Sequence, residues 1–266
     1  MNTRNDNRLI LHPSDLKGDL RAAVIDLLYR MADDEIVIGH RNSEWTGLGP
    51  ILEADIAFSS MAQDEMGHAL TYYRLLHDLG ESDPDTNAFG RGPAQYRCAT
   101  LVALAKGDWA FSIVRQFLYD AAESLRLDAL ADSAYEPLAI VARKLRGEEK
   151  YHLMHGRTMM ARLGPATSES HRRMQAAVDK AWPHALGLFE PTRWNGALAD
   201  AGIVPREEEL LRRWRESVTP VLTEAKLTIP NAAEIHGGRT GKHPPELAEL
   251  LDAMTQVYRL DPAATW

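Results

Sequence analysis

Apolar side chains recur every three or four residues over most of the chain, and no clear stretch alternates apolar and polar positions as a strand would. This pattern predicts four long helices, at about 20–40, 51–79, 108–132 and 137–163. Gly80 is expected to end the second helix, and Gly164 with Pro165 the fourth. Residues 81–93 (ESDPDTNAFGRGP) are polar and rich in Pro and Gly, so we expect a long connection between two helix pairs, which also holds the short apolar segment CATLVALA.

Further helical segments follow residue 165. The pattern predicts a helix over 167–189 that breaks near Pro183, a helix over 205–218 that has Pro205 at its first position, and a closing helix over 245–260 after a loop at 228–245. The fold class that follows is all-α. We expect one domain over 1–266, with a core bundle at about 18–164 and a C-terminal helical extension at about 165–266.

A carboxylate interrupts the apolar seam of each long helix. The seams, found by stepping three and four residues along each helix, are Val24, Leu28, Met31, Glu35, Ile38; Phe58, Met61, Glu65, His68, Tyr72, Leu75, Leu79; Ala110, Ile113, Phe117, Asp120, Ser124, Leu127; and Leu138, Val141, Leu145, Glu149, His152, Gly156, Met159, Leu163. The second and fourth seams each carry Glu-x-x-His, and Glu148 falls off the seam.

Buried carboxylates without a positive partner are costly, and no Lys or Arg lies on these seams. Two divalent cations would balance four carboxylates, and two imidazoles would complete their ligands. One carboxylate from each of two helices and Glu-x-x-His from each of two others is the ligand pattern of ferritin-like two-metal bundles. We therefore predict a two-metal site made of Glu35, Glu65, His68, Asp120, Glu149 and His152.

Several neighbours of these residues leave alternatives open. Glu123 could replace Asp120 as the ligand of the third helix, although it points away from Phe117 and Ile113. We expect Asp33, Asp34 and Asp64 to be hydrated or to lie behind the ligands. We expect His40 and His155 to lie at the surface or behind the ligands. Oxygen-rich ligation with one His per ion suits iron or manganese better than zinc. The competing interpretation is a metal-free bundle whose core polar groups satisfy one another.

Several longer segments resemble one known family. They are residues 28–69 (beginning LYRMADDE), IVRQFLYDA, KLRGEEKYHLMHG, TSESHRRMQAAVD and the tail from GRTGKHPPELAELL to the end. They resemble the subunits of the bacterial phenylacetyl-CoA ring 1,2-epoxidase, and most of all its accessory, structural subunit. The resemblance implies a ferritin-like fold, a complex with a catalytic di-iron paralogue, and a flavin/iron–sulfur reductase. It also implies insertion of one oxygen atom into the ring of phenylacetyl-CoA, using O2 and NADPH.

The resemblance leaves two roles open. Accessory subunits of this family, as typified by enterobacterial members, have lost most metal ligands, whereas this sequence keeps the whole set. The leading hypothesis is an oxygenase subunit with its own two-iron site, manganese being possible. The alternative is a non-catalytic scaffold without a metal cofactor, in which Trp182, Trp194 and Trp214 either anchor an interface or pack in the core.

Two weaker hypotheses remain. One is another ferritin-like two-metal protein, a metal store or a peroxide-dismuting enzyme, although the long C-terminal extension argues against it. The other is a radical-generating reductase subunit, for which Tyr72 is the nearest candidate tyrosine on a seam. Core packing would explain Tyr72 equally well.

Charge and composition add limits. The net charge is −8, so we expect no generic binding to nucleic acid or to anionic membranes. The single cysteine, Cys98, excludes an internal disulfide, and no apolar run reaches the roughly 18 residues of a membrane span. The first ten residues lack a signal-peptide core, so we expect a cytoplasmic protein. A CoA thioester is polyanionic, and the basic segments 143–147, 170–174 and 211–215 are either CoA contacts or solvated helix faces.

Overall fold

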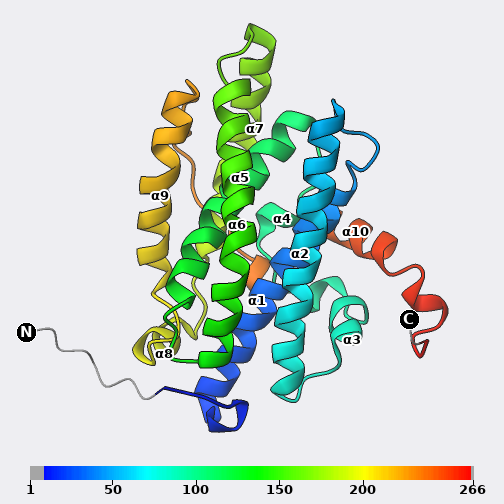
Figure 1. Ribbon diagram of the computed structural model, residues 1–266, viewed down its shortest axis with the longest axis vertical. Coiled ribbons are helices and arrows are strands. Elements are labelled where there is room, and N and C mark those ends of the chain that lie inside the picture. Colours follow the sequence, from blue (N-terminus) through cyan, green and yellow to red (C-terminus); the bar gives the residue numbers. More distant parts are fainter. Residues whose placement is uncertain (1–8, 265–266) are drawn as a thin grey trace, which may run out of the picture.

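Four long helices form the centre of the molecule (Figure 1). The computed structural model describes residues 9–264, and over that range it holds helices, loops and one isolated bridge between Ile10 and Tyr135. The long helices are α1 (Gly18–Ser43), α2 (Leu52–Asp78), α5 (Trp109–Leu130) and α6 (Glu136–Leu163). The expectation of an all-α, ferritin-like helical bundle is thus confirmed, with each long helix within three residues of its predicted ends.

Local signals in the sequence start and stop these helices. The Asp108 carboxylate caps α5 by accepting a hydrogen bond from the backbone N–H of Phe111 at 2.9 Å. Gly80 follows the last turn of α2 with a φ of 79°, a left-handed conformation that favours glycine. Helix ends of this kind depend on a few neighbouring residues, which is why they can be recognised along the chain.

The four helices form two hairpins joined by a long crossover. α1 packs against α2, α5 packs against α6, and α2 also contacts α6. The crossover contains α3 (Pro84–Phe89), a 3₁₀ turn at Pro93–Gln95 and α4 (Thr100–Ala103), which lies within the apolar segment CATLVALA. Since the hairpins meet along the seams, the acids of α1, α2, α5 and α6 are brought to one level of the core.

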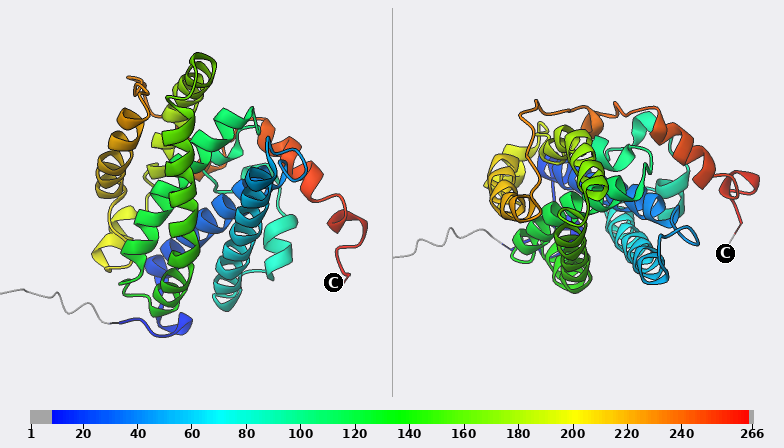
Figure 2. Two further views of the ribbon diagram at one scale, coloured as in Figure 1. Left: turned by 45° about the horizontal axis from the view of Figure 1, so that its top comes forward. Right: turned by 90° about the horizontal axis from the view of Figure 1, so that it is seen from above.

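The C-terminal helices cover the outside of the bundle. α7 (Ser168–Leu186) packs on α5, and α9 (Glu207–Glu224) packs on α5 and α6. Both views of Figure 2 place α9 on the side of α5 and α6 away from α2, while α10 (Glu246–Met254) lies at the other end of the molecule, near the crossover. The short α8 (Asn195–Asp200), which the periodicity did not predict, contacts α1.

The C-terminal region departs from the sequence prediction in all three of the predicted helices. α7 continues through Pro183 to Leu186, because a proline in the last turn removes only one bond before the helix ends. Pro205 precedes α9, which starts at Glu207 after its N-cap Arg206 and continues through Pro220. The closing segment is two pieces, α10 and a 3₁₀ turn at Tyr258–Leu260. The division into a bundle and an extension stays a prediction, and residues 1–8 and 265–266 of the expected domain lie outside the described range.

The tryptophans of the extension are core residues. Trp214 is fully buried, and its indole N–H donates to the backbone oxygen of Leu118 at 3.0 Å. Trp182 is also buried and lies 5.0 Å from Trp214 between ring centroids, while Trp194 is half-buried against the same core. For Trp182 and Trp214 the core interpretation is therefore confirmed over the interface one.

Candidate metal centre

Five of the six expected ligands form two overlapping groups in the middle of the bundle. Glu35, Glu65 and His68 form one group, and Glu65, Glu149 and His152 form the other. In each group, one ligand atom per residue lies within 4.8 Å of the others, and all five side chains are buried. Glu65 belongs to both groups, so the two groups share one carboxylate.

The two oxygens of Glu65 face different imidazoles. Oε2 lies 3.5 Å from His68 Nδ1, and Oε1 lies 3.5 Å from His152 Nδ1. Each imidazole has a second carboxylate on the same nitrogen: Glu35 at 3.6 Å from His68, and Glu149 at 3.5 Å from His152. A carboxylate placed between two such groups has the arrangement of a ligand that bridges two metal ions.

The far nitrogen of each imidazole contacts an acid of the opposite helix. His68 Nε2, on α2, lies 2.9 Å from Glu148 of α6, and His152 Nε2, on α6, lies 3.2 Å from Asp64 of α2. Contacts of this kind fix the ring orientation of metal-binding histidines. Asp64 thus lies behind His152, as expected, while the contact of Glu148 with His68 was missed because the Glu148 side chain is half-exposed and off the seam.

Asp120 lies beside the second group without joining it. Gln116 Nε2 donates to Asp120 Oδ1 at 2.6 Å and to Glu65 Oε1 at 3.1 Å, which ties the two acids together. Asn42 in turn donates to Gln116 Oε1 at 2.8 Å. Burial raises the pKa of Asp120, and the charge of Glu149 raises it further. Gln116 was not recognised from sequence, although it is one turn before Asp120 on the same helix.

Glu123 already has a positive partner. Arg126 Nη1 donates to Glu123 Oε2 at 3.2 Å, and both side chains are buried. Burial raises the pKa of Glu123 to about 7, with Arg126 opposing the rise. An arginine thus neutralises Glu123, whereas none contacts Asp120 among the described residues, and the choice of Asp120 as the third-helix ligand stays a prediction.

Many atoms of the expected ligands lack hydrogen-bond partners. Within the described residues, eight buried ligand atoms have none: both oxygens of Glu35 and Glu149, Glu65 Oε2, Asp120 Oδ2, and Nδ1 of His68 and His152. Each buried polar atom left this way costs about 1–3 kcal/mol. Burial lowers the pKa of His68, but its contacts with Glu35 and Glu65 outweigh burial and raise it to about 12. The cluster thus calls for positive charge, and divalent cations fit it.

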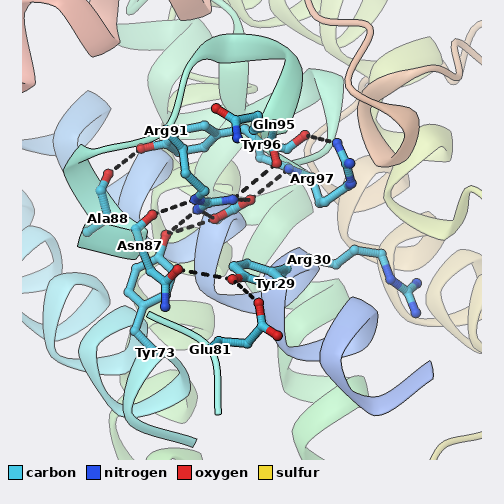
Figure 3. A network of polar contacts seen from close by, with 12 residues as sticks. Tyr29, Arg30, Tyr73, Glu81, Asn87, Ala88, Arg91, Gln95, Tyr96 and Arg97 are labelled. Carbon is cyan, nitrogen blue, oxygen red and sulfur yellow. Dashed lines mark hydrogen bonds and ion pairs between the residues drawn. The ribbon is translucent and has the colours of Figure 1, made fainter. Parts of the chain in front are cut away.

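The prediction that Asp33 and Asp34 are hydrated or lie behind the ligands is corrected by the structure. Both are buried in ion pairs, Asp33 with Arg91 and Asp34 with Arg239 at 2.8 Å. Figure 3 shows Arg91, a residue of the crossover, among Tyr29, Tyr73 and Tyr96. These arginines come from segments far away in the sequence, so the periodicity of α1 could not indicate them.

The remaining polar candidates lie outside the two groups. His40 and His155 are half-buried, and burial lowers the pKa of both. Tyr72 is fully buried with its hydroxyl lacking a partner in the described chain, and burial raises its pKa. A radical role for Tyr72 stays a prediction.

Comparison with known proteins decides the family. The family described as "Phenylacetic acid catabolic protein" matches residues 5–266. The chain belongs to this family. It is 32% identical over 239 residues to the C subunit of the 1,2-phenylacetyl-CoA epoxidase of Escherichia coli (strain K12). The aligned residues cover 89% of this chain and 96% of that subunit.

A second relative is more distant. The chain is 24% identical over 228 residues to the A subunit of the 1,2-phenylacetyl-CoA epoxidase of the same organism, covering 83% of this chain and 73% of that protein. The chain is therefore similar to two different subunits of one enzyme, and more similar to the C subunit.

The three basic segments of the chain lie on exposed helix faces. Each basic segment has an arginine paired with an acid: Arg146 with Asp128, Arg173 with Glu169, and Arg212 with Glu216. Such pairs are typical of solvated helix faces, and CoA contacts there stay a prediction.

Over residues 9–264, every helix is too short or too polar to cross a membrane.

Proposed function

We propose that the chain is a subunit of a multicomponent, O2-dependent oxygenase that epoxidises the aromatic ring of phenylacetyl-CoA, and that it has its own two-metal carboxylate site. Its family and its two relatives, both subunits of a 1,2-phenylacetyl-CoA epoxidase, support the reaction. The observation that carries the metal site is Glu65, whose two oxygens face two separate Glu–His groups.

Two iron ions, or two manganese ions, are the metals that this donor set fits. Oxygen-rich ligation with one imidazole per ion favours these metals over zinc. The proposed ligands are Glu35, Glu65, His68, Asp120, Glu149 and His152. When bound, the metals would supply the activation of O2 from which one oxygen atom enters the substrate ring.

The chain's own residues would hold this centre in place and keep it dry. Glu148 and Asp64 orient the imidazoles, and Gln116 holds Asp120 against Glu65. The seams exclude water above and below the ligands, since Phe58, Phe117 and other seam residues are fully buried. Exclusion of water strengthens the electrostatic attraction between carboxylates and cations.

We further propose that the chain works with partners in the cytoplasm: a catalytic ferritin-like paralogue, a flavin/iron–sulfur reductase, and a CoA-thioester substrate. The two relatives belong to one enzyme, which supports a complex of paralogues. Ile56 of α2 and Ile140 and Met154 of α6 are 56–59% exposed and offer apolar contact surface. The single, buried Cys98 suits a reducing compartment.

A second candidate function is a scaffold that stabilises the catalytic paralogue without turnover of its own. The chain is 32% identical to the C subunit of the relatives' enzyme and 24% identical to the A subunit. The scaffold is supported by the motifs of the chain, which resemble those of the accessory subunit of the family. Both functions place the chain in the same complex, and they differ in whether its own metal site reacts.

Metal content tests the proposed metal site. We expect the chain, purified alone from cells grown with ample iron, to hold about two ions per chain by elemental analysis. Glu65→Ala/Glu149→Ala should hold none, while the matched control Glu216→Ala/Glu224→Ala, two exposed acids of α9, should hold as many as the wild type. A wild type without metal, or a double mutant that keeps it, would overturn the metal site and leave the scaffold.

A further inference from the structure

A pocket between α5 and α6 reaches the wall of the candidate metal centre. It has a volume of about 330 Å³ and is lined by Ser124, Leu127, Asp128, Arg146, Glu149 and Lys150. Glu149 is a proposed ligand, and its side chain is fully buried, with both carboxylate oxygens covered. The pocket therefore ends against a residue of the carboxylate cluster, which lies directly behind its wall.

The lining suits ions and water better than an aromatic ring. Of the six lining side chains only Leu127 is apolar, whereas sites for apolar ligands are lined mainly by apolar and aromatic side chains. The lining includes two acids and two bases, so the local potential of the pocket depends on a few single charges. A pocket with such a lining suits water or a hydrated divalent cation.

An exposed ion pair joins the two helices beside this pocket. Arg146 Nε lies 2.9 Å from Asp128 Oδ1, and each side chain is about half-exposed, at 48% and 47%. Exposed pairs of this kind contribute only about 0–1 kcal/mol. The side chains can therefore separate readily, which would leave Asp128 free to attract a cation.

We propose that this pocket is the route by which divalent cations reach the carboxylate cluster, with Glu149 as the first ligand they meet. This inference rests on the proposed metal site. The ligands are completely buried, so an ion needs an opening through the bundle, and this pocket has a ligand in its wall. Asp128 would draw cations in, while Arg146 and Lys150 would slow their approach by repulsion.

The first test measures the rate of uptake. Metal-free chain is mixed with Co²⁺, and the visible absorption of the bound ion is followed by stopped flow at low ionic strength. Lys150→Glu should take up Co²⁺ about tenfold faster than the wild type, an advantage that shrinks in high salt. Lys144→Glu, the same charge reversal on the exposed side of α6 outside this pocket, is the matched control and should show a much smaller change.

A second test blocks the pocket. Ser124→Cys gives a partly exposed thiol, while the natural Cys98 is buried, so N-ethylmaleimide should label position 124 alone. The labelled protein should bind the same final amount of Co²⁺ at least about tenfold more slowly than its unlabelled form. Lys144→Cys, labelled in the same way, should keep the wild-type rate.

The outcomes distinguish the route from the site. Full binding at an unchanged rate in the blocked Ser124→Cys variant would overturn the route and leave the metal site standing, as would equal rates for Lys150→Glu and Lys144→Glu. Failure of the wild-type chain to bind Co²⁺ at all would overturn both.

Discussion

Each imidazole of the candidate centre is held from two sides. Nδ1 of His68 faces Glu35 and Glu65, and its Nε2 contacts Glu148 from the neighbouring helix. His152 has the same arrangement with Asp64 behind it. A ring fixed in this way loses little rotational freedom when it binds a metal, so these outer acids should contribute to affinity even though they touch no ion.

Glu148→Ala tests this contribution. We expect about two ions per chain still to bind at saturation, but with affinity lower by about 10–100-fold, because His68 loses the partner that orients it. Competition with a chelator of known affinity measures the change. The control is Glu136→Ala, which removes another acid of α6 that pairs with Arg143 and should leave the affinity unchanged. Equal affinities for the two variants would contradict the role of Glu148.

At the scale of elements, the seam of α6 depends on one close contact. A Cβ atom added at Gly156 would lie 3.1 Å from the Cα of Phe117 on α5, so a glycine lets the two helices approach. One turn after Gly156, Met160 is the buried residue of α6, whereas the seam pattern predicted Met159 at this level of the core. The helix keeps a period of 3.6 residues, which a strict step of three and four gradually misses.

Two glycines of α6 should respond in opposite directions. Gly156→Ala is expected to lower the free energy of unfolding by about 1–3 kcal/mol, because the methyl group must push α5 and α6 apart. Gly147→Ala should raise it by about 0.5–1 kcal/mol, since nothing lies within 4 Å of the added atom and alanine favours the helix. Urea denaturation of the metal-free chain measures both. A destabilising Gly147→Ala would contradict this account of the helix surface.

Over the whole molecule, buried ion pairs attach the C-terminal region to the bundle. Arg239, in a 3₁₀ turn at Gly238–Thr240, pairs with Asp34 of α1 and donates to the backbone oxygen of Leu188 at 3.1 Å. Glu207 of α9 accepts from Arg30 of α1 at 3.0 Å and lies 3.6 Å from Arg126 of α5. The tail segment containing Arg239 is thus part of the core, next to the helix that supplies Glu35.

Arg239→Met should lower the free energy of unfolding by about 3–5 kcal/mol, because it leaves the Asp34 carboxylate buried without its positive partner. Adding Asp34→Asn should recover part of the loss, which a double-mutant cycle in urea would measure. Arg259→Met, which breaks an exposed pair with Asp252, is the control and should cost about 0–1 kcal/mol. Similar losses for both single variants would show that the tail is not held by Arg239.

The order of residues along the chain was enough to establish the long helices, their seams and the acids and imidazoles on them. These features repeat at the period of the helix, so they can be followed along the chain without knowing what packs against what. The same sequence also indicated the family through its motifs, which the matches to known members bear out.

How these residues meet could be learned only from the packed helices. That Glu65 is shared, that Glu148 supports His68 and that Gln116 of α5 reaches Glu65 of α2 depend on contacts between different helices. The burial of Asp33 and Asp34 depends on Arg91 and Arg239, which are 58 and 205 residues away along the chain. Helical periodicity describes one element at a time, whereas the pairing of buried charges is settled by which elements pack together.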